Sequence, residues 1–260
     1  MSNFLEVKNV TKQFGGVVAN RNVSFTIEPG KITGLIGPNG AGKSTMFNMV
    51  SAVFPPTEGE IWFEGKRIDK LPTYKMATLG ISRTFQNLQV FKKMTVLENV
   101  MVGLHTRTTT GLLAAALKLP KSKQEEAFIY EKAMEELRFV EIEDIRDVVA
   151  GNLSLGKLRL LELARALATE PKLLLLDEIA AGLNHQETFE MSKLIRRIQN
   201  RNISIFVVEH DMDLVMNICD KIIVLDQGEK IAEGTAKEVQ SNERVIEAYL
   251  GADDEEEVIV

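Results

Sequence analysis

The stretch that decides the fold of this chain is a glycine-rich loop ending in lysine, serine and threonine: Gly37-Pro38-Asn39-Gly40-Ala41-Gly42-Lys43-Ser44-Thr45. It follows the apolar run Ile32–Ile36, which is typical of a buried strand, and precedes Met46–Val53, which has a helical pattern. The order of strand, G-x-x-x-x-G-K-[ST] loop and helix is that of a phosphate-binding loop. Its glycines let backbone N–H groups converge on phosphate oxygens, and a helix beginning near Lys43 directs its positive dipole end at the same anion. We therefore predict nucleotide binding.

Two side chains of this phosphate loop (residues 37–45) have predicted roles of their own. Lys43 is predicted to reach the β- and γ-phosphates, and the Ser44 hydroxyl is predicted to hold Mg²⁺. The alternative is a glycine-rich turn that binds nothing, and chance matches to the pattern occur on the order of once per hundred chains of this size. The strand before the loop and the helix after it favour the phosphate loop.

A second apolar run, Leu173–Leu176, ends in the acid pair Asp177 and Glu178. Open α/β sheets bind ligands at the carboxyl ends of their parallel strands, so this pair is expected at the same site as the phosphate loop. Asp177 is predicted to contribute to the Mg²⁺ shell, and Glu178 is predicted to polarise the attacking water. The alternative interpretation is a pair of helix-capping acids, which the phosphate loop makes less favoured.

A five-residue segment, Leu153-Ser154-Leu155-Gly156-Lys157, precedes the acid pair, with the helical stretch Leu158–Thr169 between them. This order resembles the signature segment, intervening helix and acidic strand of ABC-type ATPases. The resemblance runs from Phe4 to Gly251 and implies further roles. The adenine-stacking aromatic, the lid glutamine that contributes to the Mg²⁺ shell, the dimer loop and the switch histidine correspond to Phe14, Gln86, Ala181–Asn184 and His210.

The predicted fold class is α/β, with a P-loop core built on a parallel sheet. Further signals are an apolar run at Ile203–Val208, and alternating apolar residues at Val23–Ile27 and Ile61–Phe63 that predict an antiparallel β subdomain. Between about residues 90 and 150 the strand signals fade, and Lys123–Val140 has the spacing of an amphipathic helix. We predict one ABC-type nucleotide-binding domain over residues 1–251 with an inserted α-helical subdomain, followed by an acidic tail at 252–260.

Four segments narrow the resemblance to the ATPase subunits of branched-chain amino acid importers: residues 83–86, 94–100, 180–184 and 246–251. Importers of amides and urea, and ATPases of lipopolysaccharide export, share much of this pattern and remain alternatives. The chain departs from the usual family sequence at three positions. Leu155 and Lys157 replace a glycine and a glutamine of the signature segment, and Ile179 stands where a proline usually follows the catalytic acid.

The resemblance implies a mechanism in which two ATPase subunits sandwich ATP and Mg²⁺, with Ser154, Leu155, Gly156 and Lys157 acting across the dimer interface. Lys157 either strengthens this ATP-bound pairing or faces solvent or a neighbouring acid. The implied partners are a second ABC ATPase subunit, identical or paralogous, transmembrane permease subunits contacted by residues 90–150, and indirectly a substrate-binding protein. A soluble ABC ATPase acting on ribosomes or DNA is a rival, but such proteins usually carry two nucleotide domains or a long coiled-coil insert.

Composition agrees with a globular protein: of 260 residues, 45% are apolar and 26% charged, and the mean hydropathy is −0.03. Apolar runs fall short of the roughly 20 residues that a membrane span needs, and we expect no leader. The single cysteine, Cys219, agrees with a reducing compartment.

Of the net charge of −6, residues 253–257 contribute five negative charges, which leaves about −1 and no basic surface for nucleic acid. His105, His185 and Cys219 lack the spacing of a zinc site. A cytoplasmic protein, peripheral on the inner face of the cell membrane, is expected.

Overall fold

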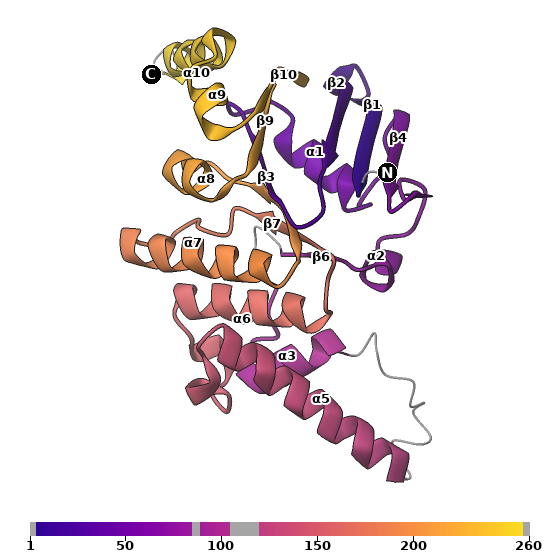
Figure 1. Ribbon diagram of the computed structural model, residues 1–260, viewed down its shortest axis with the longest axis vertical. Helices are drawn as coiled ribbons and strands as arrows, with labels where there is room; N and C mark the ends of the chain where they lie inside the picture. Colours follow the sequence, from indigo (N-terminus) through magenta and orange to yellow (C-terminus); the bar gives the residue numbers. More distant parts are fainter. Residues whose placement is uncertain (1–3, 85–88, 105–119, 257–260) are drawn as a thin grey trace.

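The computed structural model describes residues 4–84, 89–104 and 120–256, and these residues form two sheets with flanking helices (Figure 1). The larger sheet has the strand order β10-β9-β3-β8-β7-β6. Strands β9, β3, β8, β7 and β6 are parallel, and β10 pairs with β9 in the antiparallel sense at the edge. The bounds are β3 Ile32–Ile36, β6 Ile81–Arg83, β7 Leu173–Asp177, β8 Ser204–Val208, β9 Lys221–Asp226 and β10 Glu229–Gly234.

The three central strands β3, β7 and β8 are buried at every residue. Strands of a parallel sheet covered on both faces read as continuous apolar runs, which is why the sequence predicted them within a residue or two. The parallel-sheet prediction is therefore confirmed.

The smaller sheet is antiparallel, with the order β2-β1-β4-β5. Its strands are β1 Leu5–Phe14, β2 Val17–Ile27, β4 Glu58–Phe63 and β5 Lys66–Arg67. The alternation that predicted β2 and β4 matches their buried positions, so the antiparallel subdomain is confirmed. Strand β1 gave no such signal, because register shifts and a positive φ of 49° at Asn9 interrupt its alternation.

The described residues include nine α-helices: α1 Lys43–Val50, α2 Tyr74–Leu79, α3 Val96–Gly103, α5 Pro120–Phe139, α6 Leu155–Ala168, α7 His185–Asn200, α8 Met212–Ile218, α9 Ala236–Gln240 and α10 Glu243–Glu256. Short 3₁₀ turns occupy Glu143–Ile145 and Ala150–Asn152. Helices α3, α5 and α6 pack together at one end of the molecule (Figure 1). Helix α10 continues through Glu256, so the first part of the acidic run extends a helix. Across the described residues, none of these helices combines the length and apolar character of a membrane span.

Two helix boundaries differ from the sequence-based prediction. Helix α1 ends at Val50, three residues before the predicted end, because Ala52 has a φ of 54° that no right-handed helix allows. Helix α6 begins at Leu155, three residues earlier than predicted. Consequently Leu155, Gly156 and Lys157 form its first turn, and Ser154 is its N-cap.

The hydrophobic core lies in two layers. One layer fills the space between the two sheets and includes the apolar face of α1, with Met46 and Phe47 fully buried. The other lies on the opposite face of the large sheet, under α6, α7 and α8. Because α1 is fixed between the sheets, the phosphate loop that precedes it is held at the carboxyl edge of β3.

Candidate functional site

The phosphate loop passes so close to neighbouring backbone at two of its three glycines, Gly37 and Gly42, that a side chain cannot replace them. Gly37 has a φ of 151°, and a Cβ atom there would lie 2.0 Å from the carbonyl oxygen of Leu225. Gly42, the N-cap of α1, has a φ of 94°, and its Cβ would lie 2.4 Å from the carbonyl oxygen of Ala19. Both glycines are therefore required by contact as well as by conformation.

The loop surrounds a cavity of about 280 Å³. Its lining consists of Ala19, Asn39, Gly40, Ala41, Gly42, Lys43, Ser44, Thr45 and His210. Inside it Lys43 is buried, and its Nζ donates hydrogen bonds of 2.7 and 2.8 Å to the carbonyl oxygens of Gly37 and Pro38. Burial lowers the pKa of Lys43, and the Glu178 carboxylate partly offsets that shift. The ammonium group is thus held in place at the anion-binding end of α1.

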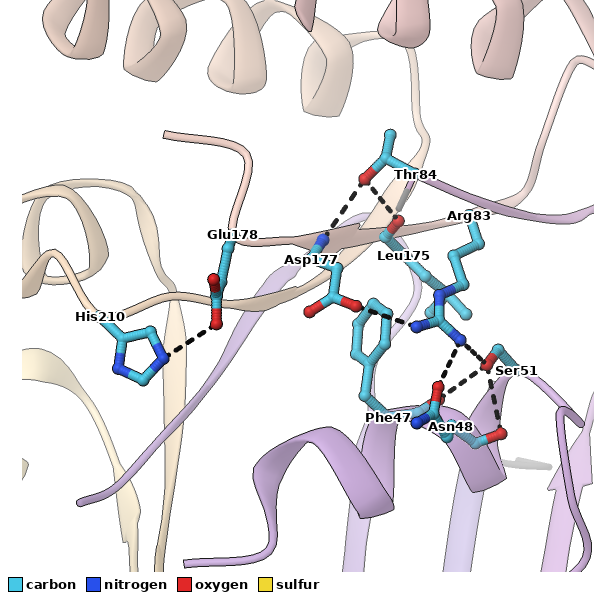
Figure 2. A network of polar contacts seen from close by, with 9 residues as sticks. All are labelled: Phe47, Asn48, Ser51, Arg83, Thr84, Leu175, Asp177, Glu178 and His210. Atoms are coloured by element: carbon cyan, nitrogen blue, oxygen red, sulfur yellow. Dashed lines mark hydrogen bonds and ion pairs between the residues drawn. The ribbon is translucent and has the colours of Figure 1, made fainter. Parts of the chain in front are cut away.

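Asp177 is the last residue of β7 and Glu178 follows it, and a contact joins Glu178 to His210, two residues after the end of β8. Oε1 of Glu178 lies 3.0 Å from Nε2 of His210 (Figure 2). Glu178 has a φ of 47°, an uncommon value outside glycine that is often found at functional sites. Its N–H donates to the carbonyl of Val208 at 2.9 Å, which fixes this turn against β8. The structure therefore brings together the predicted water-polarising acid and the predicted switch histidine.

Glu209 is a buried acid that sequence reasoning missed. Its Oε1 accepts a 2.9 Å hydrogen bond from the N–H of Ala180, so it joins the end of β8 to the loop after Glu178. Burial raises the pKa of Glu209 to about 7. The sequence did carry a signal for Glu209, because an acid placed between a buried apolar strand and His210 is itself expected to be buried and to need hydrogen-bond donors.

The donor atoms present fit Mg²⁺. Ser44 is exposed on the first turn of α1, and Asp177 ends β7 with a buried carboxylate. Within the described residues no group of three or more histidines, cysteines or acids could hold a metal ion by itself. Mg²⁺ prefers oxygen ligands and usually takes only one or two from protein, with water and phosphate completing its shell. Gln86, the third predicted contributor to this shell, lies outside the described residues.

The signature segment lines a different cavity from the phosphate loop. Ser154, Gly156 and Lys157 border a space of about 470 Å³ beside α7. Ser154 is exposed, and no side-chain cap bond to it occurs among the described residues. A Cβ at Gly156 would lie 2.7 Å from Oε1 of Glu187, so this glycine lies directly against the first turn of α7. Within one copy of the chain, the signature segment and the phosphate loop thus remain separate.

Two further predicted residues sit at the edges of these sites. Leu155 lies against the dimer loop, because its Cδ2 would be 2.7 Å from a Cβ at Gly182. Phe14, at the end of β1, is about half exposed and meets Phe54 edge-on with ring centroids 5.5 Å apart. The Nζ of Lys12 lies 5.0 Å from the Phe14 ring. A supported, half-open aromatic ring has the geometry of a stacking platform.

Comparison with known proteins gives matches over most of the chain. The ABC transporter family profile matches residues 20–181, and the profile of the branched-chain amino acid ATP-binding cassette transporter matches residues 229–255. The high-affinity branched-chain amino acid transport ATP-binding protein BraF of Pseudomonas aeruginosa is 42% identical over 248 residues, covering 95% of this chain and 97% of the relative. The corresponding LivG protein of Escherichia coli K12 is 41% identical over the same shares of both chains.

Solved structures agree with these matches. An ATP-binding cassette of an ABC transporter in its ADP conformation superposes with a TM-score of 0.83 at 33% identity, covering 96% of this chain and 100% of the other. A dimeric cassette in a post-hydrolysis state, bound to ADP and Pi, gives a TM-score of 0.75 at 26% identity, covering 89% of this chain and 98% of the other.

Proposed function

This chain belongs to the ABC transporter family as an ATP-hydrolysing subunit, and we propose that it powers import of branched-chain amino acids through membrane-spanning partner subunits. The match to import ATPases at 42% identity over nearly the whole chain supports this substrate class. The observation that carries the ATPase function is the meeting of the phosphate loop, the acid pair and His210 at the carboxyl ends of β3, β7 and β8.

In the proposed reaction Lys43 and the N–H groups of the phosphate loop bind the triphosphate. Ser44 and Asp177 would hold Mg²⁺, which when bound neutralises charge on the β- and γ-phosphates. Glu178 accepts the proton of the attacking water, and His210 holds the Glu178 carboxylate in the direction of the γ-phosphate. Phe14 stacks on the adenine.

The complete site is proposed to need two ATPase subunits. Because the signature segment of one copy lies apart from its own phosphate loop, Ser154 and the N-terminal turn of α6 are free to donate to the γ-phosphate held by a partner. The partner is an identical copy or a paralogue. Hydrolysis removes the bridging γ-phosphate, and the two subunits separate.

The proposed contact with the membrane-spanning partner is a groove of about 520 Å³ between the end of β6, α3 and α6. Phe91 lines it with 48% of its surface exposed, and Val102 adds a second exposed apolar side chain. Phe91 and Val102 belong to the region between residues 90 and 150 that was predicted to contact the permease, and β6 and α6 supply further lining residues. Docking there places the chain on the cytoplasmic face of the membrane, and a substrate-binding protein would act only through the permease.

The test is purification of the tagged chain from solubilised membranes of cells that express it, followed by identification of co-eluting membrane-spanning subunits. The recovered complex is then placed in proteoliposomes loaded with ATP. We expect uptake of labelled leucine, isoleucine or valine that depends on internal ATP. Recovery without any membrane-spanning subunit would contradict the transport function, and uptake of urea without leucine would move the chain to the amide and urea importers.

A matched pair of variants tests the docking groove. Phe91→Ser should reduce co-elution of the permease, because it removes the exposed aromatic of the groove. Phe189→Ser, which changes a comparably exposed phenylalanine on α7, should leave co-elution unchanged. Equal effects of the two substitutions would place the permease contact elsewhere.

A further inference from the structure

Arg83 ends β6 and lies between the two elements that carry the predicted Mg²⁺ ligands (Figure 2). Its Nη2 donates a 2.9 Å hydrogen bond to Oδ2 of Asp177. Its Nη1 donates to Oδ1 of Asn48 at 2.7 Å and to Oγ of Ser51 at 2.6 Å. The side chains of Arg83 and Asp177 are only 15% and 8% exposed, so these bonds form largely out of water.

Packing fixes the plane of this guanidinium group. Its central carbon lies 4.8 Å from the ring centroid of Phe47, which is fully buried. The next residue also secures the strand end, because the Thr84 hydroxyl accepts a bond of 3.3 Å from the N–H of Asp177. The backbone N–H of Thr84 donates to the carbonyl of Leu175 at 2.9 Å. These contacts fix the position of the Arg83 guanidinium group relative to the end of β7.

The contacts join β7 to α1. Asn48 lies on α1 and Ser51 is its C-cap, while Ser44 lies on the first turn of the same helix. Oδ2 of Asp177 is taken by Arg83, and Figure 2 shows the other carboxylate oxygen turned away from Arg83, to the side where Glu178 and His210 lie. One planar side chain therefore sets both the rotation of the Asp177 carboxylate and its distance from the helix that carries Ser44.

We propose that Arg83 is a positioning residue for Mg²⁺: it bridges Asp177 to α1 so that the two protein ligands of the ion are held in register before nucleotide and metal arrive. This inference rests on the proposed function, in which Asp177 and Ser44 hold the ion. A planar guanidinium suits the bridge because its fork reaches several oxygens at once, which a lysine ammonium on a flexible stem does not.

Removing Arg83 should have two opposing effects on the affinity for Mg²⁺. Arginine adds a positive charge near the cation, and its removal would relieve that repulsion. Its removal also frees a buried carboxylate to rotate, and loss of a group that orients a metal ligand typically weakens metal binding by about 10- to 100-fold. Asp177 is buried, and Arg83 holds its Oδ2. We therefore expect the loss of orientation to outweigh the relief of repulsion.

The experiment measures ATP binding of the purified full chain by calorimetry, first in EDTA and then across a Mg²⁺ series. Arg83→Gln should raise the Mg²⁺ concentration that gives half of the metal-dependent gain in affinity by about 10- to 100-fold. Its affinity for ATP in EDTA should stay close to that of the unsubstituted chain, because Arg83 is not among the described residues that line the phosphate cavity. We expect Arg83→Gln to unfold at a lower temperature than the unsubstituted chain. Arg83→Lys should restore the unfolding temperature but keep the raised Mg²⁺ requirement.

Arg201→Gln is the matched control. Arg201, the C-cap of α7, donates hydrogen bonds of 2.6 and 2.7 Å to the buried carboxylate of Glu136. Neither residue is among the described residues that line the phosphate cavity. This variant should unfold at a lower temperature with an unchanged Mg²⁺ requirement. If Arg83→Gln does not fold, Asn48→Ala carries the test, since it removes one α1 anchor and should raise the Mg²⁺ requirement severalfold.

Three results would overturn the inference. They are an unchanged or lowered Mg²⁺ requirement in folded Arg83→Gln, an equal loss of ATP affinity with and without Mg²⁺, and full recovery of the requirement by Arg83→Lys. Failure of the unsubstituted chain to bind ATP at all would instead contradict the proposed function.

Discussion

The contact between Glu178 and His210 gives a prediction that two substitutions and their combination can test. General base catalysis contributes about 10²- to 10⁴-fold to rate, so Glu178→Gln should slow ATP turnover by that factor, or about 3 to 5 kcal/mol of barrier. Glutamine keeps the size of glutamate and tolerates the φ of 47° as well as glutamate does, so we expect little change in unfolding temperature. ATP affinity should be retained, because Glu178 is not among the described residues that line the phosphate cavity.

Combining the two substitutions uses the 3.0 Å separation of the side chains. His210 acts partly through Glu178, so the losses of turnover in Glu178→Gln and His210→Ala should not multiply in the double variant. The double variant should turn over within about tenfold of the slower single variant. The hydrogen bond is worth about 1.5 kcal/mol, the low end for a charged group, because the His210 side chain is 49% exposed.

The assays are phosphate release for turnover, calorimetry for ATP affinity, and sedimentation for assembly. Glu178→Gln should form a dimer with MgATP, since the γ-phosphate that joins the two copies is no longer removed. The reasoning is refuted if the fold-loss of turnover in the double variant equals the product of the two single fold-losses. It is also refuted if Glu178→Gln loses ATP affinity and turnover by the same factor.

Three further predictions concern binding, pH and salt. Lys43→Ala should weaken MgATP binding at least about tenfold in calorimetry, since each lost charge-assisted bond is worth about 1.5–3 kcal/mol; an unchanged Kd would contradict the phosphate loop. Burial raises the pKa of Glu209 from 4.5 to about 7, so the native state retains a proton that the unfolded chain releases, and this group's contribution to stability falls as pH rises across that window. Glu209→Gln should therefore gain on the order of 3 kcal/mol in free energy of unfolding relative to the unsubstituted chain between pH 4.5 and 8 in urea titrations, and a pH-independent difference would argue against it. If Lys157 strengthens the ATP-bound dimer, adding Lys157→Gln to Glu178→Gln should flatten the salt dependence of dimerisation, whereas parallel curves would leave Lys157 a solvated lysine.

Local sequence was sufficient for the elements that carry the chemistry. The strands β3, β7 and β8 are buried along their whole length, so each appears as an apolar run whose end is marked by the first polar or glycine-rich residues. The phosphate loop follows from the spacing of its glycines, lysine and serine, because few other sequences permit such close approach of backbone to an anion. These features need only neighbours in the chain, which is why a linear sequence predicts them.

Helix ends and the position of the signature segment were predicted less well. A helix boundary depends on single φ values, such as 54° at Ala52, and alanine gives no sign of a left-handed conformation. The first turn of α6 contains Leu155 and Gly156, neither of which announces a helix start, and Ser154 takes the N-cap position without a side-chain bond among the described residues.

The individual side-chain contacts between distant parts of the chain were decided by tertiary structure. Strand β3 is flanked by β8 and β9, so the strand leading to His210 adjoins that of the phosphate loop, and the acid pair lies one strand further away. Arg83 and Asp177 are 94 positions apart, and Glu178 and His210 are 32 apart, yet each pair forms a hydrogen bond. The apolar composition of each strand predicts that the strand is buried but not which strand it pairs with, because any apolar strand can be buried between the same layers. The order of strands in the sheet, fixed by the packing of the whole chain, selects these contacts.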